Sequence, residues 1–291
     1  MAKSLRLAGL LYSPFFHKAK LILDHLHRIQ PAEFGSPECI GFLEYQWKSY
    51  IHNLRGEKGG EMWGFSGDAI VFCDDIPIGP CEAVVTWAAN NWGFQDSRPL
   101  AFYEALAKDA YNAYIARKES AFVFMDVCIE GEYIGKLVFE LYRHMCPITC
   151  NNFVALCTGE KGVSTSGVKL SYANSLFHRI VKGGWIQGGD ICTGSGAQGE
   201  SIYGPTFDDE SFAVPHDTDG IIGMANHGPN TNNSQFYITL KPAPWMNKIY
   251  VAFGRVVEGS SVLEQLGNVK TYNERPKDFC QVSNCGILPP I

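Results

Sequence analysis

A permanently charged side chain, Arg179, lies a few residues before the amide Gln187 in the segment FHRIVKGGWIQGGD (177–190). A guanidinium holds several donors in one plane and keeps its proton. It therefore suits a site that stabilises a basic or partly negative atom without proton transfer. A second segment, MANHGPNTNNSQF (224–236), supplies further amides. Such side chains form either a binding groove or ordinary structural contacts in strands and turns. The residue types alone do not decide between these two interpretations.

The ten cysteines are a second possible source of chemistry. No CxxC pair occurs, and the CxxxC spacing of Cys146 and Cys150 matches no common zinc framework. We therefore expect structural thiols, with no metal site and no cofactor. The apolar start MAKSLRLAGLLYS lacks a signal-peptide cleavage site and is interpreted as a buried strand, so we expect a cytoplasmic protein with reduced thiols.

Length and charge limit the classes of function. A chain of 291 residues, 46% of them hydrophobic, predicts two domains with ample cores. A net charge of −6 argues against a nucleic-acid-binding protein. No stretch reaches the roughly 18 apolar residues that a membrane span needs, so we expect no membrane partner.

The first domain is predicted over residues 1–99, where strands and helices alternate. The expected strands are Leu5–Leu11, Cys39–Leu43, Ala69–Cys73 and Ile76–Ile78. The expected helices begin at Ser13-Pro14, Glu44 and Pro80, with a loop over Arg55–Gly67. This order indicates a small α/β unit. A linking helix is predicted within residues 100–119, and a mainly β domain over 120–291.

The element order of the first domain resembles the thioredoxin/glutaredoxin fold. The segment YSPFFHKAK (12–20) lies where that family carries its CxxC, yet it contains no thiol. Redox exchange needs a low-pKa thiolate, usually with a second thiol beside it, and Cys39, Cys73 and Cys81 do not form that motif. The resemblance implies a docking or packing module, with a thiol oxidoreductase as the weaker alternative.

The second domain carries a more specific signal. FHRI and QGGD, followed by MAN, GPNTN and SQF, occur in the order in which the cyclophilins carry them. Over residues 120–287 the chain resembles this family of peptidyl-prolyl cis–trans isomerases. The resemblance implies a closed, eight-stranded antiparallel barrel capped by two helices, with a peptide-binding groove on its outer face.

The chemistry of such a groove follows from the peptide bond. Resonance opposes rotation about C–N by about 18–20 kcal/mol, whereas the two isomers of an X–Pro bond differ by only about 0.5–1 kcal/mol. A catalyst therefore needs no nucleophile, metal or cofactor. It must hold the proline ring in an apolar pocket and stabilise the twisted amide with a fixed donor.

The resemblance also implies roles for individual residues. Arg179 matches the catalytic arginine, and Gln187 matches the glutamine that orients the arginine and the substrate carbonyl. Five further positions match residues that line the groove or bind its ligands: Gly196, Ala225, Asn226, Gln235 and Trp245. With this match, a binding groove is favoured over ordinary strand contacts.

The proline pocket departs from the family's pattern. Gly184 stands where active members have a phenylalanine, and four other pocket positions also differ: Trp185, Tyr237, Met246 and Tyr250. Losing a ring face from the proline costs about 1–2 kcal/mol of apolar contact. Trp185 is placed to refill the void with a changed shape, and the hydroxyl of Tyr237 to protrude into the pocket. We therefore expect weak or absent isomerase activity, with peptide binding retained.

An insertion, VSTSGVKLSYANSL (163–176), resembles that of the divergent-loop cyclophilins, which also carry a glutamate at the position of Glu200. Some of that subgroup have cysteines that match Cys157 and Cys285, so the resemblance implies a possible redox pair. Buried, reduced thiols are the favoured alternative.

Two functions remain in competition. The favoured one is a binding or structural part of a larger assembly that contacts proline-containing segments of partner proteins. The alternative is an active isomerase that assists protein folding. The pairing of the two domains resembles cyclophilin-like proteins of ciliated organisms, so the axoneme of the cilium, and within it a radial spoke, is the favoured location.

Overall fold

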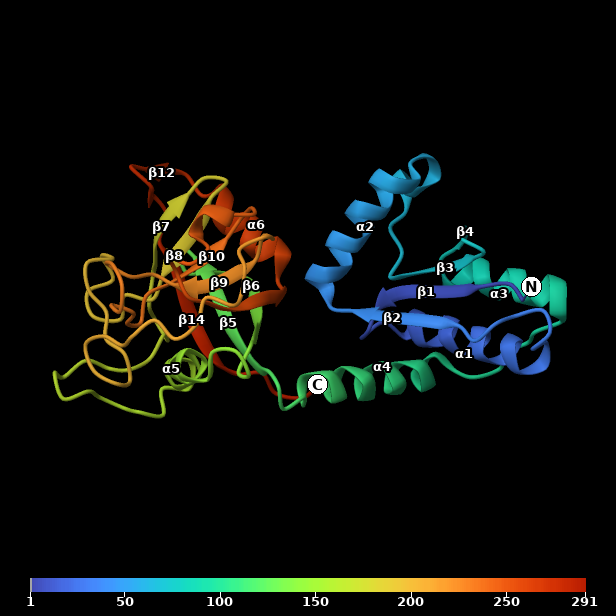
Figure 1. The fold of residues 1–291 in the computed structure, drawn as a ribbon, viewed down its shortest axis with the longest axis horizontal. Helices are drawn as coiled ribbons and strands as arrows, with labels where there is room; N and C mark the ends of the chain where they lie inside the picture. Colours follow the sequence, from blue (N-terminus) through green and yellow to red (C-terminus); the bar gives the residue numbers. More distant parts are fainter. Residues whose placement is uncertain (1) are drawn as a thin grey trace. The chain divides into compact units, whose positions relative to one another are not determined.

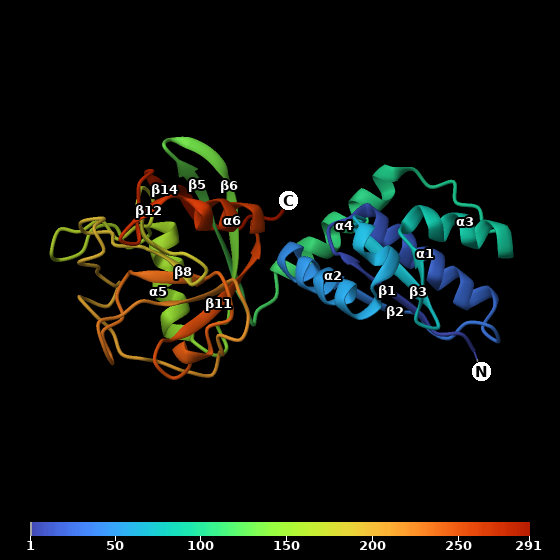
Figure 2. The ribbon, with the colours of Figure 1, turned by 90° about the horizontal axis from the view of Figure 1, so that it is seen from above.

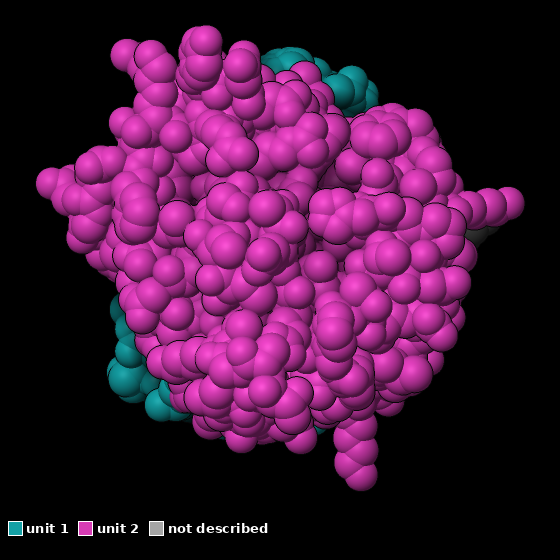
Figure 3. Space-filling model, turned by 90° about the vertical axis from the view of Figure 1, so that its left-hand side faces the viewer, with its two compact units in different colours: residues 1–116, 291 teal, residues 117–290 magenta. Residues whose placement is uncertain are grey.

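The structure is a computed structural model that describes residues 2–291. Its internal contacts divide the chain into two units, residues 1–116 together with Ile291, and residues 117–290. Figure 3 colours the two units separately. No helix among the described residues is both long enough and apolar enough to cross a bilayer.

The first unit is built on a four-stranded sheet (Figure 1). Its strands are β1 (Leu5–Leu10), β2 (Glu38–Phe42), β3 (Ala69–Cys73) and β4 (Ile76–Gly79), in the order β2-β1-β3-β4. β1 is parallel to β2, whereas β3 is antiparallel to both of its neighbours. The predicted α/β unit is therefore present.

Helices cover both faces of this sheet. They are α1 (Pro14–Ile29), α2 (Glu44–Lys58), α3 (Cys81–Trp92) and α4 (Leu100–Ile115), with a 3-10 helix, η1 (Gly60–Gly64). Alternate strand residues point to opposite faces, so Leu5 and Leu7 pack with α1 and α3 while Ala8 and Leu10 pack with α2. The loop expected over Arg55–Gly67 is instead partly helical, and the linking helix predicted within residues 100–119 ends at Ile115.

The second unit is a nearly closed antiparallel barrel, which confirms the predicted eight strands. The strands are β5 (Ala121–Ile129), β6 (Glu132–Leu141), β7 (Phe177–Val181), β8 (Trp185–Gly188), β9 (Ile221–Met224), β10 (Phe236–Thr239), β11 (Ala252–Glu258) and β14 (Cys280–Ile287). They follow the order β14-β5-β6-β11-β9-β10-β8-β7. A single bridge between Leu176 and Gln281 joins the two edges.

Two helices, α5 (Pro147–Thr158) and α6 (Ser260–Asn268), lie at opposite ends of this barrel in Figure 1. Figure 2 shows the same barrel turned by 90°. Aromatic rings fill its interior, with Phe153 of α5 packed 5.4 Å from Phe236 and 5.3 Å from Phe253 between ring centroids. A short 3-10 helix, η2 (Pro244–Met246), and the hairpin β12 (Thr271–Tyr272)–β13 (Arg275–Pro276) lie outside the barrel sheet.

Candidate functional site

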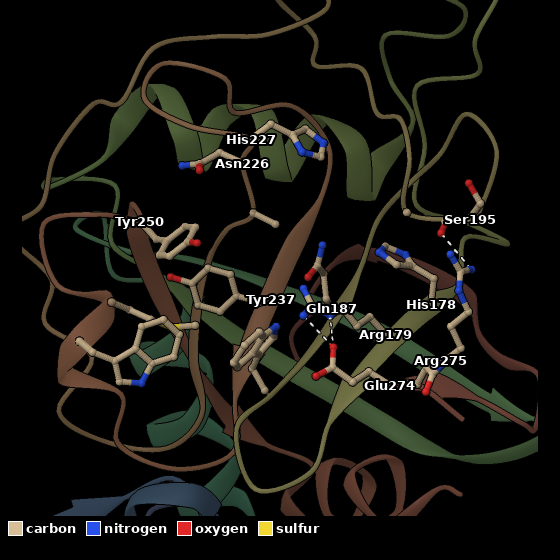
Figure 4. Close-up of a pocket in the computed structure, with 16 residues that line it drawn as sticks. His178, Arg179, Gln187, Ser195, Asn226, His227, Tyr237, Tyr250, Glu274 and Arg275 are labelled. Carbon is tan, nitrogen blue, oxygen red and sulfur yellow. Dashed lines mark hydrogen bonds and ion pairs between the residues drawn. The ribbon is translucent and has the colours of Figure 1, made fainter. Parts of the chain in front are cut away.

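A hollow of about 510 Å³ lies in the second unit and is lined by residues from β7, β8, β10, η2 and the β12–β13 hairpin (Figure 4). It brings together nearly all of the predicted groove residues: Arg179, Trp185, Gln187, Gly196, Ala225, Asn226, Tyr237, Trp245, Met246 and Tyr250. Gln235 is buried directly behind Gln187.

A chain of amides forms one wall of this groove. Gln187 Nε2 donates to Gln235 Oε1 at 2.9 Å, and Gln235 Nε2 donates to the carbonyls of Gly196 at 3.1 Å and Gln198 at 2.8 Å. The two glutamines thereby fix the loop that carries Gly196. The structure gives Gln187 a hydrogen bond to Gln235 and, within residues 2–291, none to Arg179, which differs from the predicted orienting role.

Arg179 is held instead by a residue that the sequence analysis missed. Its Nε donates to Glu274 Oε2 at 2.7 Å, and its Nη2 lies 2.7 Å from the same oxygen. Its Cζ lies 5.3 Å from the centroid of the Trp185 ring, a cation–π distance. Glu274 lies in the turn TYNER (271–275), and a glutamate in a turn carries no motif that could have predicted this contact.

One polar atom beside the groove has no partner among the described residues. Asn226 Nδ2 is buried without an acceptor, although Asn226 Oδ1 accepts from Gly228 N–H at 3.2 Å. Buried polar groups are normally hydrogen-bonded, but this nitrogen is enclosed by protein, so a ligand reaches it only after the side chain turns. His178 is also buried, and burial lowers its pKa.

Gly196 lies against His178, as a pocket-lining glycine must. Its φ is +85°, and a Cβ built on it would lie 2.5 Å from His178 Cδ2. Any other residue would therefore both strain the backbone and collide with the His178 ring.

The hydroxyl of Tyr237 does not protrude into the pocket, which corrects the expectation from sequence. It is hydrogen-bonded to His216 Nε2 at 2.6 Å, in a buried contact, and Tyr237 is only 2% exposed. Gly223 makes room for it, because a Cβ at that position would lie 2.2 Å from the hydroxyl oxygen. The ring therefore lines the pocket while its polar end is satisfied below the surface.

The rest of the proline pocket is apolar. Tyr237, Ala243 and Met246 form a buried cluster, with Trp185 and Tyr250 packed against it. The Trp185 ring lies 5.7 Å from that of Trp245 and stays only half-buried. Gly184, in the turn before β8, contributes no side chain. The pocket thus keeps aromatic walls but has no phenylalanine at its usual place.

The predicted cysteine pair is brought together by α5 and β14. Cys157 and Cys285 are free thiols joined by a hydrogen bond. Burial, with this bond, raises the pKa of Cys157 well above its usual range, and the bond lowers the pKa of Cys285. The inserted loop is tied down separately, by a hydrogen bond from the Ser166 hydroxyl to Glu200.

A family model described as "Cyclophilin type peptidyl-prolyl cis-trans isomerase/CLD" matches residues 124–287. The chain belongs to the cyclophilin family. Its cyclophilin domain coincides with the barrel and includes Arg179, Gln187, Asn226 and Gln235.

Two curated relatives of this cyclophilin match nearly the whole chain, and a third matches a little over half of it. The mouse (Mus musculus) "Probable inactive peptidyl-prolyl cis-trans isomerase-like 6" is 45% identical over 284 residues, covering 98% of this chain and 91% of that protein. The human (Homo sapiens) protein of the same name is 44% identical over 281 residues, covering 97% and 90%. "Peptidyl-prolyl cis-trans isomerase cyp11" of Rhizopus delemar is 48% identical over 168 residues, covering 57% and 50%.

Proposed function

We propose that this cyclophilin binds extended, proline-containing peptide segments in its groove and has little isomerase activity. The observation that carries the proposal is a groove with its polar wall kept and its proline pocket changed. The hydrogen-bonded amides of Gln187 and Gln235 are in place, whereas Gly184 has no side chain at the usual phenylalanine position.

The two parts of the site act on different steps. Hydrogen bonds to the backbone of the peptide stabilise its ground state and its transition state equally. They therefore contribute to affinity but do not accelerate isomerisation. Lowering the barrier requires a proline ring fixed against an apolar wall while the amide twists. Loss of one ring face weakens that hold, and about 1–2 kcal/mol of lost contact lowers turnover about 5- to 30-fold. Two relatives that span nearly the whole chain carry "probable inactive" in their names, which supports the same conclusion.

A matched pair of assays on the full chain tests the proposal. Titration with a capped peptide such as Ala-Ala-Pro-Phe is expected to show saturable binding, and an isomerisation assay with the same peptide to show turnover far below that of an ordinary cyclophilin. Ordinary turnover, lost on Arg179→Ala, would instead establish the alternative, an active isomerase that assists folding.

Gly184→Phe sharpens the test. A Cβ at this position would lie 3.0 Å from Val181 Cγ1, so the ring is admitted only if this β-branched side chain shifts by a few tenths of an ångström. We expect about a tenfold gain in turnover as the proline wall is rebuilt. An unchanged rate would show that the empty position is not what limits catalysis.

For the first unit we propose a thioredoxin-like frame that serves as a docking module. The order strand–helix–strand–helix–strand–strand–helix supports this fold. The thiols do not support redox chemistry, because burial raises the pKa of both Cys39 and Cys81 to about 11. The proposed location, the ciliary axoneme, rests on the resemblance of the domain pairing, and co-purification from cilia against cytosol tests it.

A further inference from the structure

We propose that Glu274 is a built-in restraint on Arg179, a carboxylate that a bound peptide must displace before the guanidinium can face it. Glu274 is then a positioning residue that weakens binding of neutral peptides and withholds Arg179 from the twisted amide. The inference rests on the proposed function, because it concerns the same groove.

The contact is built on two anchors. Besides the ion pair, the Glu274 carbonyl accepts a hydrogen bond at 2.7 Å from the backbone N–H of Ile180, the residue next to Arg179 on β7. The neighbouring Arg275 donates from Nη1 to the carbonyl of Ser195 at 3.3 Å, which ties the hairpin to the groove wall carrying Gly196. Glu274 is therefore held beside Arg179 by the backbone as well as by charge.

The backbone of the turn does not account for a glutamate here. Asn273 and Glu274 form a two-residue hairpin loop with φ values of 47° and 64°, both in the left-handed region. Such loops favour Asn-Gly, because glycine adopts the second conformation without steric cost. A glutamate in this conformation is disfavoured, and residues kept in such conformations cluster at functional sites. The pairing with Arg179 supplies the compensating interaction.

Displacement by a peptide is an unequal exchange. A charge-assisted bond to a carboxylate is stronger than a bond to a neutral carbonyl, so a neutral peptide gains less from Arg179 than Glu274 loses. The side chains of Arg179 and Glu274 are 43% and 46% exposed, so water and salt screen their attraction. The restraint is therefore modest and can be reversed, and salt weakens it.

Glu274→Gln tests the restraint in the full chain, since it removes the charge and keeps the shape. The matched control is Glu264→Gln, an exposed glutamate on α6. The first readout is the Nε–H resonance of Arg179, assigned with Arg179→Lys. We expect a clear shift in Glu274→Gln and none in the control.

The second readout is the affinity for capped Ala-Ala-Pro-Phe. We expect Glu274→Gln to bind about two- to fivefold more tightly than the unchanged protein at low salt. Added NaCl should strengthen binding by the unchanged protein and leave the variant unaffected. Glu274→Gly, which suits the turn, should give the same gain and covers the case in which Glu274→Gln misfolds.

The outcomes separate this inference from the proposed function. An unchanged Arg179 resonance in Glu274→Gln, or equal affinities for both Gln variants and the unchanged protein, overturns the restraint. A shifted resonance with no peptide binding by any form overturns the peptide-binding function and leaves the restraint of Arg179 supported.

Discussion

At the scale of single residues, Tyr237, His216 and Asn247 form a chain whose proton positions can be derived. Asn247 Oδ1 accepts from the backbone N–H of His216 at 2.8 Å, so this atom is the amide oxygen. His216 Nδ1 lies 2.9 Å from the same oxygen and must donate to it. Burial lowers the pKa of His216 and so favours the neutral ring, in which Nε2 accepts from the Tyr237 hydroxyl.

Tyr237→Phe is expected to destabilise the protein and to leave catalysis weak. The change leaves His216 Nε2 buried without a donor, which costs about 1–3 kcal/mol. Urea unfolding measures the loss, with Tyr133→Phe, an exposed tyrosine of the same unit, as the control. A variant as stable as the unchanged protein would show that the hydroxyl is not structural, and a large gain in isomerase activity would show that it blocks the pocket.

His216 also predicts a pH dependence. Burial lowers its pKa, so the unfolded chain takes up a proton near pH 6.5 while the folded chain stays neutral. The free energy of unfolding should therefore be at its full value above about pH 6.5 and should decrease as the pH falls towards 5. The buried His178 contributes in the same direction.

Urea unfolding at several pH values between 5 and 7.5 measures this slope. His216→Gln keeps one donor and one acceptor but does not titrate, so its slope should be shallower. His52→Gln, at an exposed position, is the control and should match the unchanged protein. Equal slopes for all three would contradict the assignment.

At this scale, the sequence predicted the position of a residue when that position depends on a local motif. It did not predict contacts with a residue far away in the sequence. Arg179 lies on β7 and Gln187 on β8, the next strand along the chain. Because these two strands pair, the two residues lie opposite one another in one groove. Glu274 reaches Arg179 only through the β12–β13 hairpin, nearly a hundred residues along the chain. The direction of the Tyr237 hydroxyl depends on Gly223 and His216, which no local pattern connects to it.

At the scale of elements, α5 and β14 place one thiol each at their contact. The hydrogen bond that lowers the pKa of Cys285 makes its thiolate more available, while Cys157 stays protonated and buried. We expect Cys285 to be alkylated faster than Cys157. We also expect diamide to join them, each thiol losing one hydrogen as diamide is reduced to the hydrazine.

Peptide mapping after oxidation checks the pair. Cys157→Ala should abolish the cross-linked peptide and, because it removes the hydrogen bond, slow alkylation of Cys285. Cys280→Ala, on the same strand, should do neither. If oxidation yields no Cys157–Cys285 peptide, or if Cys157→Ala leaves the reactivity of Cys285 unchanged, the redox pair is excluded.

Most helices and strands could be predicted from their own residues, but several of their end points could not. Pro14 begins α1 because its fixed φ and missing N–H suit the first turn, and Ser13 caps the helix by accepting from Phe15 N–H. The extension of α2 to Lys58 has no such local signal. There Arg55 binds the carbonyls of Met62 and Phe65, contacts that form only once the chain has folded back.

At the scale of the whole molecule, the groove belongs to one unit. Every residue that lines it lies between His178 and Arg275, inside the barrel unit. Peptide binding should therefore survive separation of the two units. Lys118 is exposed in the turn that follows α4, so trypsin is expected to cut there first.

Such a cut removes Arg117, one of the partners of the buried Glu140. Ser120 Oγ at 3.0 Å and Arg255 Nη2 at 2.8 Å continue to pair that carboxylate. Mass spectrometry identifies the fragments, and titration with Ala-Ala-Pro-Phe compares them with the full chain. Loss of binding in the C-terminal fragment would show that the groove needs the first unit.

The space above Gly223 also couples two positions of the pocket wall. A side chain added at Gly223 would collide with the Tyr237 hydroxyl, whereas removing that hydroxyl leaves His216 Nε2 without a donor. Neither residue can therefore be exchanged alone without loss of stability. A redesign of the proline pocket has to change Gly223, Tyr237 and His216 together.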